Sequence, residues 1–249
     1  MNHSGIEIWQ GDCFELMGKI ADQSVDAIIT DPPYGTTKLE WDQKIDLAAW
    51  WDAAGRVIKP SGVIAMFAAQ PFATDLINSN RKWFRYELIW RKSRAVGFLD
   101  ANKRPLRAHE NILIFSRYFK RSNDGKRAAT TYNPQFTVGK PYKKNGGLNH
   151  TAHYGKWSDL PAREYDGRRY PVDVLDFASD NNAHSLHPTQ KPLELVKWLV
   201  LTYTNAGELV LDPFAGSGTT LAACQETGRR AIGIENNIDF VKICGNRIG

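Results

Sequence analysis

The sequence lacks long apolar runs and has few cysteines. A membrane-spanning helix needs about 18 consecutive apolar residues, and no run in the 249 residues reaches that length. The amino-terminal residues have neither the basic region nor the apolar core of a secretory signal. Cys13, Cys224 and Cys244 are odd in number and lack metal-ligand spacing. We therefore expect a cytoplasmic protein that does not enter membranes.

The spacing of the histidines also does not predict a metal site. His150 and His153 stand three residues apart, as do His184 and His187, but no cysteine or carboxylate completes a ligand set near either pair. Zinc sites in proteins take four such ligands, or three with an open position. We therefore predict no metal.

Positive charge is concentrated in one segment. The chain has a net charge of +5, yet residues 117–170 contain twelve Lys and Arg against four Asp and Glu. Aromatic residues and histidines are interleaved with these cations: Tyr132, Phe136, Tyr142, His150, His153, Tyr154 and Trp157. Cations neutralise phosphates and rings stack on bases. A solvated lysine-rich loop would have similar charge, but the aromatic residues favour a nucleic-acid surface.

Apolar strand-like runs alternate with helical patterns on both sides of that segment. The expected strands are Ile6–Trp9, Val25–Thr30, Gly62–Ala68, Tyr86–Trp90, Asn111–Phe115, Glu208–Leu211 and Arg230–Ile234. The expected helices are Phe14–Ile20, Asp46–Ile58, Phe72–Asn78, Leu193–Tyr203, Thr219–Thr227 and Ile238–Arg247. This alternation predicts an α/β fold with a mostly parallel sheet. Between residues 116 and 184 periodicity fades, which indicates a loop-rich insertion or a small second module.

The first motif is Asp31-Pro32-Pro33-Tyr34, directly after an apolar run. Two prolines provide no amide hydrogens and fix two φ angles, so the strand must end there. A plain turn would satisfy the same pattern, but Asp-Pro-Pro-Tyr arises by chance in on the order of one in a thousand chains of this length. The motif therefore lies at the carboxyl end of a strand, where α/β sheets bind ligands.

These four residues suit an exocyclic base amine, which is a poor nucleophile because its lone pair is delocalised into the ring. The Asp31 carboxylate and the Pro32 carbonyl would accept its two hydrogens and localise the lone pair. Tyr34 would stack on a base swung out of the duplex. Much of the rate would come from holding this amine in line with a methyl donor.

The second motif is Leu209-Val210-Leu211-Asp212-Pro213-Phe214-Ala215-Gly216-Ser217-Gly218-Thr219-Thr220, which is followed by a helix. Gly216 and Gly218 permit close backbone approach, and the helix start favours an anionic group. Glu235 ends the next strand, where a carboxylate can accept hydrogen bonds from ribose hydroxyls. A glycine turn alone is common, but the combination predicts nucleoside binding. The dinucleotide fingerprint fails because Leu221 occupies its third glycine position, and no Walker-type lysine follows.

In this order the motifs resemble the beta class of amino DNA methyltransferases, in which the catalytic motif precedes the cofactor motif. The resemblance covers nearly the whole chain. It implies a circularly permuted, Rossmann-like class I methyltransferase fold, with a seven-stranded mixed sheet and an inserted target-recognition region. Glu208–Leu211 would then lie beside Val25–Thr30. We expect a catalytic half at 1–115, the recognition insertion at 116–184 and a cofactor-binding half at 185–249.

The resemblance also assigns residues. Asp31, Pro32, Pro33 and Tyr34 would be catalytic. S-adenosylmethionine would contact Asp12 and Cys13 at its adenine, Glu235 at its ribose, and residues of the His187–Pro192 segment at its methionine end. The full expected cofactor set is Asp12, Cys13, Asp31, Thr189, Lys191, Asp212, Phe214, Ala215, Gly216, Ser217, Gly218, Thr219 and Glu235.

Double-stranded DNA is the expected partner, and its expected phosphate contacts are Arg91, Lys92, Arg94, Lys143, Lys144, Arg168 and Arg169. The first three are expected in a loop, and we expect Lys103, Arg104 and Arg107 to act similarly. His109-Glu110 either lines the base pocket or is structural. Specificity must reside in roughly 70 residues, which suggests a short target site or help from a second subunit. A homodimer and a cognate restriction endonuclease are both plausible partners.

Adenine N6 is the favoured target, since relatives that methylate cytosine N4 usually have Ser in place of Asp31. Methylation of RNA, or of a protein glutamine with Asn at that position, fits less well. Cytosine C5 chemistry uses a cysteine after a proline, and none of the three cysteines follows one. A catalytically silent DNA-binding subunit is the non-enzymatic alternative, and it would not need Asp31, Tyr34, Gly216 and Glu235 together.

Overall fold

The computed structural model describes residues 2–3, 5–35, 43–118, 130–145, 150–151, 155–156, 162–179 and 190–249. They form two compact units, one of Met1–Asn133 with Asp173–Gly249 and one of Pro134–Val172. None of the helices in the described ranges is long and apolar enough to span a membrane.

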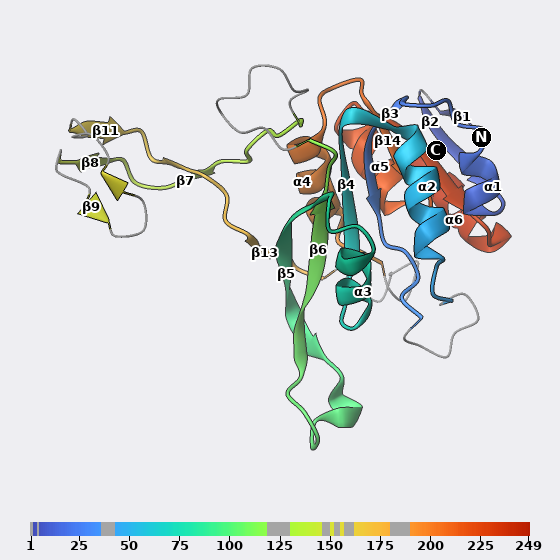
Figure 1. Cartoon of the computed structure of the whole chain (residues 1–249), viewed down its shortest axis with the longest axis horizontal. Coiled ribbons are helices and arrows are strands. Elements are labelled where there is room, and N and C mark those ends of the chain that lie inside the picture. Colours follow the sequence, from blue (N-terminus) through green and yellow to red (C-terminus); the bar gives the residue numbers. More distant parts are fainter. Residues whose placement is uncertain are drawn as a thin grey trace. The chain divides into compact units, whose positions relative to one another are not determined.

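The first unit is built on a mixed sheet with strand order β1-β2-β15-β14-β3-β4-β6-β5-β13 (Figure 1). The strands are β1 (Asn2–His3), β2 (Ile6–Gln10), β3 (Val25–Thr30), β4 (Ile58–Ala68), β5 (Phe84–Val96), β6 (Arg107–Phe115), β13 (Val174–Asp176), β14 (Leu209–Asp212) and β15 (Arg230–Glu235). All seven expected strands are present, and short β1 and β13 extend the sheet at its two edges. Pairs β1–β2, β4–β6 and β5–β6 are antiparallel, and the others are parallel.

Helices cover the two faces of this sheet. Within the described ranges they are α1 (Cys13–Met17), α2 (Leu47–Val57), α3 (Phe72–Ser79), α4 (Leu193–Tyr203), α5 (Thr219–Glu226) and α6 (Ile238–Ile248). Side chains of β3 alternate between faces, as the strand geometry requires. Ala27 and Ile29 pack in the cluster with α4, α5 and α6, whereas Ile28 packs in the cluster with α1, α2 and α3. Apolar residues on both faces explain why β3 is buried along its whole length.

The central pair of strands joins distant parts of the chain. Val210 pairs with Ala27 and Leu211 with Ile28 in a parallel register. The predicted neighbourhood of these two strands is therefore confirmed. Because parallel strands end at the same sheet edge, the two sequence motifs that follow them are brought together.

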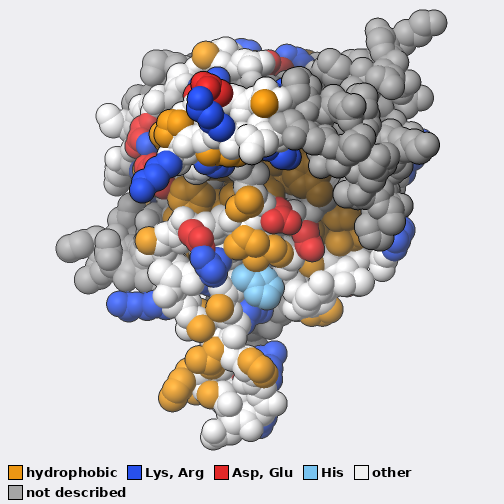
Figure 2. Space-filling model, turned by 90° about the vertical axis from the view of Figure 1, so that its left-hand side faces the viewer, with side chains coloured by type: hydrophobic (Ala, Val, Ile, Leu, Met, Phe, Trp, Pro, Cys, Tyr) orange, Lys and Arg blue, Asp and Glu red, His pale blue; other side chains and the backbone are white. Residues whose placement is uncertain are grey.

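Strands β5 and β6 run well beyond the expected ends and form a projecting hairpin, with a 3-10 turn, Phe98–Asp100, near its tip (Figure 1). The prediction that residues 91–94 lie in a loop is wrong, since Arg91 pairs with His109 and Val96 with Arg107. The arm carries hydrophobic and basic side chains at its free end (Figure 2). Phe98 and Leu99 are 81% and 99% exposed there. The apolar pattern used to predict strands did not extend past Trp90, because the following residues of β5 are mostly polar and exposed.

The second unit lies within the segment where periodicity fades. Its described strands form three short antiparallel pairs: β7 (Thr137–Val138) with β12 (Arg168–Arg169), β8 (Tyr142–Lys144) with β11 (Arg163–Tyr165), and β9 (His150–Thr151) with β10 (Gly155–Lys156). Two ring pairs pack in this unit, Phe136 on Tyr170 and Tyr142 on Tyr165. Almost all of its described side chains are exposed or half-buried.

Candidate active site

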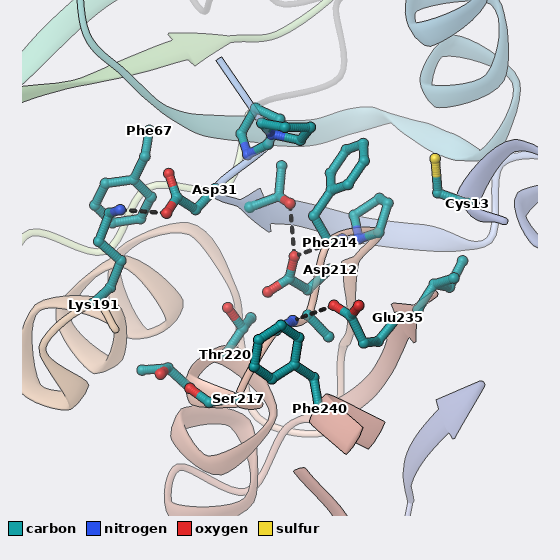
Figure 3. Close-up of a pocket in the computed structure, with 18 of the residues that line it drawn as sticks. Cys13, Asp31, Phe67, Lys191, Asp212, Phe214, Ser217, Thr220, Glu235 and Phe240 are labelled. Carbon is teal, nitrogen blue, oxygen red and sulfur yellow. Dashed lines mark hydrogen bonds and ion pairs between the residues drawn. The ribbon is translucent and has the colours of Figure 1, made fainter. Parts of the chain in front are cut away.

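A cavity of about 540 Å³ lies at the carboxyl ends of β3 and β14. Both sequence motifs line it, as Figure 3 shows for Asp31, Asp212, Phe214 and Ser217. Thr30, the last residue of β3, donates a 2.6 Å hydrogen bond from Oγ1 to Asp212 Oδ1. This bond ties the ends of the two strands together directly before Asp31.

The first motif presents a carboxylate that is held on two sides. Tyr34 donates from its hydroxyl to Asp31 Oδ1 at 2.6 Å, and its ring stacks on Phe72 with centroids 5.3 Å apart. Lys191 forms an ion pair with the other oxygen, Oδ2. Burial, with the neighbouring Asp31 charge, raises the pKa of Tyr34 well above its ordinary value. Tyr34 is therefore a neutral donor to Asp31.

Lys191 belongs to a network of alternating positive and negative side chains that runs from Asp31 to Lys92. Its ammonium lies 3.4 Å from Glu110 Oε2 and 5.0 Å from the centre of the Phe67 ring. Glu110 Oε1 in turn pairs with Lys92. Burial lowers the pKa of Lys191, but the Asp31 and Glu110 carboxylates outweigh it and leave the pKa raised. For Glu110 burial raises the pKa, and the Lys191 and Lys92 ammonium groups outweigh it and leave the pKa lowered. Lys191 and Glu110 are therefore both charged near neutral pH.

The second motif forms a turn whose backbone faces the cavity. Asp212 Oδ1 accepts the amide hydrogen of Phe214 at 3.2 Å, which fixes the start of the turn. Gly216 and Gly218 adopt positive φ angles of 51° and 78°, a region that glycine enters without steric cost. Glu235 Oε2 accepts from the Gly216 amide at 2.9 Å, and its Oε1 accepts from the Asn237 amide at 2.8 Å. These bonds orient the Glu235 carboxylate beside the turn.

Asp212 is a buried carboxylate with no cation against it among the contacts of the described residues. It accepts hydrogen bonds from Thr30 and from the Phe214 amide. Burial raises its pKa to about 6, and hydrogen bonds only partly oppose the shift. Asp212 therefore joins the two motifs at an energetic cost to the fold.

The structure brings most of the predicted site residues to this one cavity. Its lining includes all four residues of the first motif, and Asp12, Cys13, Lys191, Asp212, Phe214, Ala215, Gly216, Ser217, Thr219 and Glu235. Gly218 does not line it: it precedes α5 and packs against Cys244. Thr189 lies outside the described residues. Asp12 caps α1 by accepting from the amides of Phe14 and Glu15.

The three cysteines are buried and form no disulfide. Burial raises the pKa of Cys13 and of Cys244 to about 12, and that of Cys224 as well. A thiol with such a pKa is not a nucleophile at neutral pH. Within the described ranges, no group of three metal-ligating side chains is found.

The predicted phosphate contacts fall into two groups. Lys143, Lys144, Arg168 and Arg169 belong to β8 and β12 of the second unit, where Arg169 lies over the Tyr142 ring and Arg168 over Phe136. Arg91, Lys92 and Arg94 belong to β5. Arg91 forms an ion pair with Asp176, and Lys92 is largely buried against Glu110. Lys92 thus points to the cavity network.

Several residues that line the cavity were not among the predicted catalytic and cofactor-binding residues. Phe67 and Phe240 flank the cavity from β4 and α6 (Figure 3). Arg107, which was predicted as a phosphate contact, and Glu110 both come from β6. An apolar residue at a strand or helix end has the same pattern as a core residue. Only Glu110 was predicted to line the base pocket, as one of two alternatives for His109-Glu110.

Comparison with known proteins identifies the family. A family model described as DNA methylase, covering N6 and N4 methyltransferases, matches residues 25–246. The chain belongs to this DNA methylase family. M.HpaI, a type II methyltransferase of Haemophilus parainfluenzae, is 25% identical over 253 residues, which span 95% of this chain and 72% of that protein. The chain is thus a DNA amino-methyltransferase of the class that modifies adenine N6 or cytosine N4.

Solved structures share the fold of this DNA methylase. The M1.HpyAVI–SAM complex aligns with a TM-score of 0.62 at 24% identity, covering 97% of this chain and 99% of that one. The cytosine-N4-specific PvuII DNA methyltransferase aligns with a TM-score of 0.68 at 15% identity, covering 99% and 87%. TTHA0409 of Thermus thermophilus, complexed with S-adenosyl-L-methionine, aligns with a TM-score of 0.61 at 21% identity, covering 98% and 94%. The predicted methyltransferase fold is therefore confirmed.

Proposed function

We propose that this DNA methylase transfers a methyl group from S-adenosylmethionine to the exocyclic N6 of adenine in double-stranded DNA. One observation carries the proposal: the Asp31 carboxylate and the glycine turn at Gly216 line the same cavity. An acceptor for an amine and a turn for a nucleoside therefore face one space. Reacting groups held together in this way need no further encounter.

The groups that line the cavity fit S-adenosylmethionine in their chemistry. A Cβ built on Gly216 would meet nothing within 4 Å, so this backbone is open to a ligand. Backbone amides orient Glu235, and each of its oxygens keeps a lone pair for a ribose hydroxyl. The start of α5 favours the carboxylate of the methionine end. S-adenosylmethionine supplies the electrophilic methyl group, and the solved complexes of M1.HpyAVI and TTHA0409 support this choice.

The target amine would bind at the first motif. Asp31 accepts one of its hydrogens and the Pro32 carbonyl accepts the other, which localises the nitrogen lone pair toward the methyl donor. Asp31 is held in place for this role by Tyr34 and Lys191. The Tyr34 ring, supported by Phe72, offers a face to the flipped base.

Adenine is favoured over cytosine because the first motif begins with Asp31, where cytosine-N4 relatives usually have Ser. Cytosine N4 is the second candidate, and the likeness to the PvuII enzyme favours it. The test is to incubate the protein with methyl-labelled S-adenosylmethionine and unmethylated genomic DNA, then hydrolyse the DNA and identify the labelled nucleoside. N6-methyldeoxyadenosine supports the proposal, and N4-methyldeoxycytidine overturns it in favour of the second candidate.

We also propose that residues 116–184 recognise the target sequence. The second unit exposes the cations Lys143, Lys144 and Arg168 beside the rings of Phe136 and Tyr142. Such a surface can bind phosphates and stack on bases. This placement leaves residues 1–115 and 185–249 as the catalytic and cofactor-binding halves.

Two partner predictions accompany this function. A homodimer would supply a second recognition segment to a chain whose own is short, and light scattering with and without DNA tests it. A cognate restriction endonuclease would cut the same site when unmethylated. Protection of methylated DNA from cleavage by the candidate nuclease tests that pairing.

A further inference from the structure

Both oxygens of the Asp31 carboxylate are engaged in the structure. Tyr34 donates to Oδ1 at 2.6 Å, and the Lys191 ammonium pairs with Oδ2. Each oxygen keeps one lone pair, so a target amine that donates to Asp31 must either share an oxygen with one of these donors or displace that donor. Lys191 is the more readily replaced, because Tyr34 is fixed by its stacking on Phe72. If the amine displaces Lys191, the largely buried Lys191 ammonium needs another carboxylate partner.

Glu110 offers that place. Its side chain is only 13% exposed, and its Oε2 atom has no hydrogen-bond partner among the described residues. A buried carboxylate oxygen that has an ion pair but no well-formed hydrogen bond is only partly satisfied. Oε2 lies 3.4 Å from Lys191 Nζ, just beyond a good charge-assisted hydrogen bond. A small movement of the ammonium would complete this bond.

Two neighbours favour a movement of Lys191 toward Glu110. Lys92 pairs with Glu110 Oε1 and so anchors the carboxylate. The Phe67 ring lies 5.0 Å from Lys191 Nζ and bounds its other side. In Figure 3, Lys191 and Phe67 lie on one side of Asp31, whereas Phe214, Glu235 and Cys13 lie on the other. Lys191 can therefore move without entering the part of the cavity assigned to the cofactor nucleoside.

We propose that Glu110 is a positioning residue that takes Lys191 over from Asp31 when the target amine binds. Asp31 Oδ2 then loses an ammonium hydrogen bond and gains one from the amine, while Lys191 gains one from Glu110 Oε2. No charge enters or leaves the network, so the exchange requires little desolvation. The inference rests on the proposed function only in that an amine-bearing base must reach Asp31, so it applies equally to adenine and cytosine.

The test compares Glu110→Gln, Lys191→Met and the double variant at saturating S-adenosylmethionine and DNA. In Glu110→Gln we expect kcat to fall by at least about tenfold, because Lys191 stays on Asp31, while the affinity for S-adenosylmethionine changes little. The Tm should fall, because the largely buried Lys92 loses its carboxylate partner, so every variant is assayed well below its unfolding range. Glu110→Asp keeps the charge at a greater distance and should fall between Gln and wild type. Glu87→Gln is the matched control, since Glu87 lies in the same hairpin and bonds Asn111 outside the cavity. It should behave as wild type.

The double variant decides the point. Removing Lys191 frees Asp31, so Glu110→Gln with Lys191→Met should turn over faster than Glu110→Gln alone. A merely structural role for Glu110 predicts that the two effects add, and additive effects overturn the inference. If the wild-type protein labels no DNA base, the proposed function itself fails. If it labels DNA but the effects add, only the role of Glu110 fails.

Discussion

Thr30 Oγ1 and Asp212 Oδ1 are joined by a 2.6 Å hydrogen bond across 182 residues of sequence. The same Asp212 oxygen accepts the Phe214 amide at 3.2 Å. One buried carboxylate thus fixes both the residue before the catalytic motif and the start of the glycine turn. The two motifs are far apart along the chain, so non-covalent contacts such as this one must set the distance between the amine acceptor and the cofactor turn.

Asp212→Asn should stabilise the fold at high pH. The pKa of Asp212 is about 6 in the native state and 3.8 ordinarily, so the native state binds the proton more tightly. Below pH 3.8 Asp212 is protonated in both the native and the unfolded state and does not destabilise the fold. As the pH rises from 3.8 to about 6 the unfolded state loses this proton first, so the free energy of unfolding decreases, by on the order of 3 kcal/mol above pH 6. The Tm of the variant minus that of wild type should therefore increase between about pH 4 and pH 7. Thermal unfolding across this range measures it.

Asp26→Asn serves as the control for this pH series. Asp26 is also a buried carboxylate, but it pairs with Lys59 and accepts the Leu209 amide. Its replacement leaves a cation unpaired and should lower the Tm at about pH 7. A pH-independent Tm difference for Asp212→Asn would contradict the account of its burial.

Asp31→Ala should abolish methyl transfer while reducing cofactor affinity only moderately. The variant has no acceptor for the amine, and removal of one preorganised polar group at a reacting centre costs about 100- to 1000-fold in turnover. The glycine turn and Glu235 are untouched, so binding of S-adenosylmethionine persists. Radiolabel transfer and calorimetric titration measure the two effects. Near-normal turnover in Asp31→Ala would defeat the mechanism.

Replacements of Tyr34 separate the ring from the hydroxyl. Tyr34→Phe removes the 2.6 Å bond to Asp31 and should slow turnover roughly fivefold, as for one hydrogen bond of about 1 kcal/mol. Tyr34→Ala also removes the stacking face and should cost a further factor of about 5 to 100. Single-turnover rates on one duplex give both values. Equal effects of the two variants would argue against base stacking.

Local sequence patterns predicted the two motifs because each is enforced by a few adjacent residues. Pro32 and Pro33 must end β3, and Gly216 and Gly218 must turn before α5, whatever the rest of the chain does. The pairing of β14 with β3 was predicted from the family resemblance and not from the apolar runs. The runs indicate which segments are strands, but they do not say which strands are neighbours.

The charge network and the hairpin could not be predicted in this way. Lys191 and Asp31 are 160 residues apart, and Lys92 meets Glu110 only because β5 pairs with β6 in one particular register. Nothing in the spacing of these residues indicates contact. The extension of β5 past Trp90 contains three basic residues and is mostly exposed, so the apolar pattern ends before the strand does.

Gly218→Ala and Gly216→Ala should differ in kind. A Cβ on Gly218 would lie 2.4 Å from Cys244 Sγ at a φ of 78°. We therefore expect Gly218→Ala to lower the free energy of unfolding by roughly 1–3 kcal/mol and to lower the Tm clearly. A Cβ on Gly216 meets nothing within 4 Å, although its φ of 51° strains an alanine, so we expect a smaller fall in Tm together with a higher KM for S-adenosylmethionine. Thermal unfolding and steady-state kinetics compare the pair. Identical effects of the two variants would mean that the turn does not face a ligand.

Replacing Lys143, Lys144, Arg168 and Arg169 together by Gln should weaken DNA binding and flatten its salt dependence. Each phosphate that the protein no longer neutralises lowers the slope of log K against log salt by about 0.9. Lys143 and Arg168 already pair with Glu164 and Asp166, so the slope should fall by about 2 to 3.5. Binding titrations between about 50 and 300 mM salt measure the change.

The matched control for this quadruple variant replaces four exposed cations of the first unit: Lys19, Lys82, Arg230 and Lys242. Both variants remove the same net charge, so a purely global electrostatic effect would lower the slope equally in the two. If the second unit contacts phosphates, the slope should instead fall mainly in the variant that lacks Lys143, Lys144, Arg168 and Arg169. Local neutralisation releases counterions only where protein and DNA touch. Equal slopes would mean that the second unit is not the DNA-binding surface.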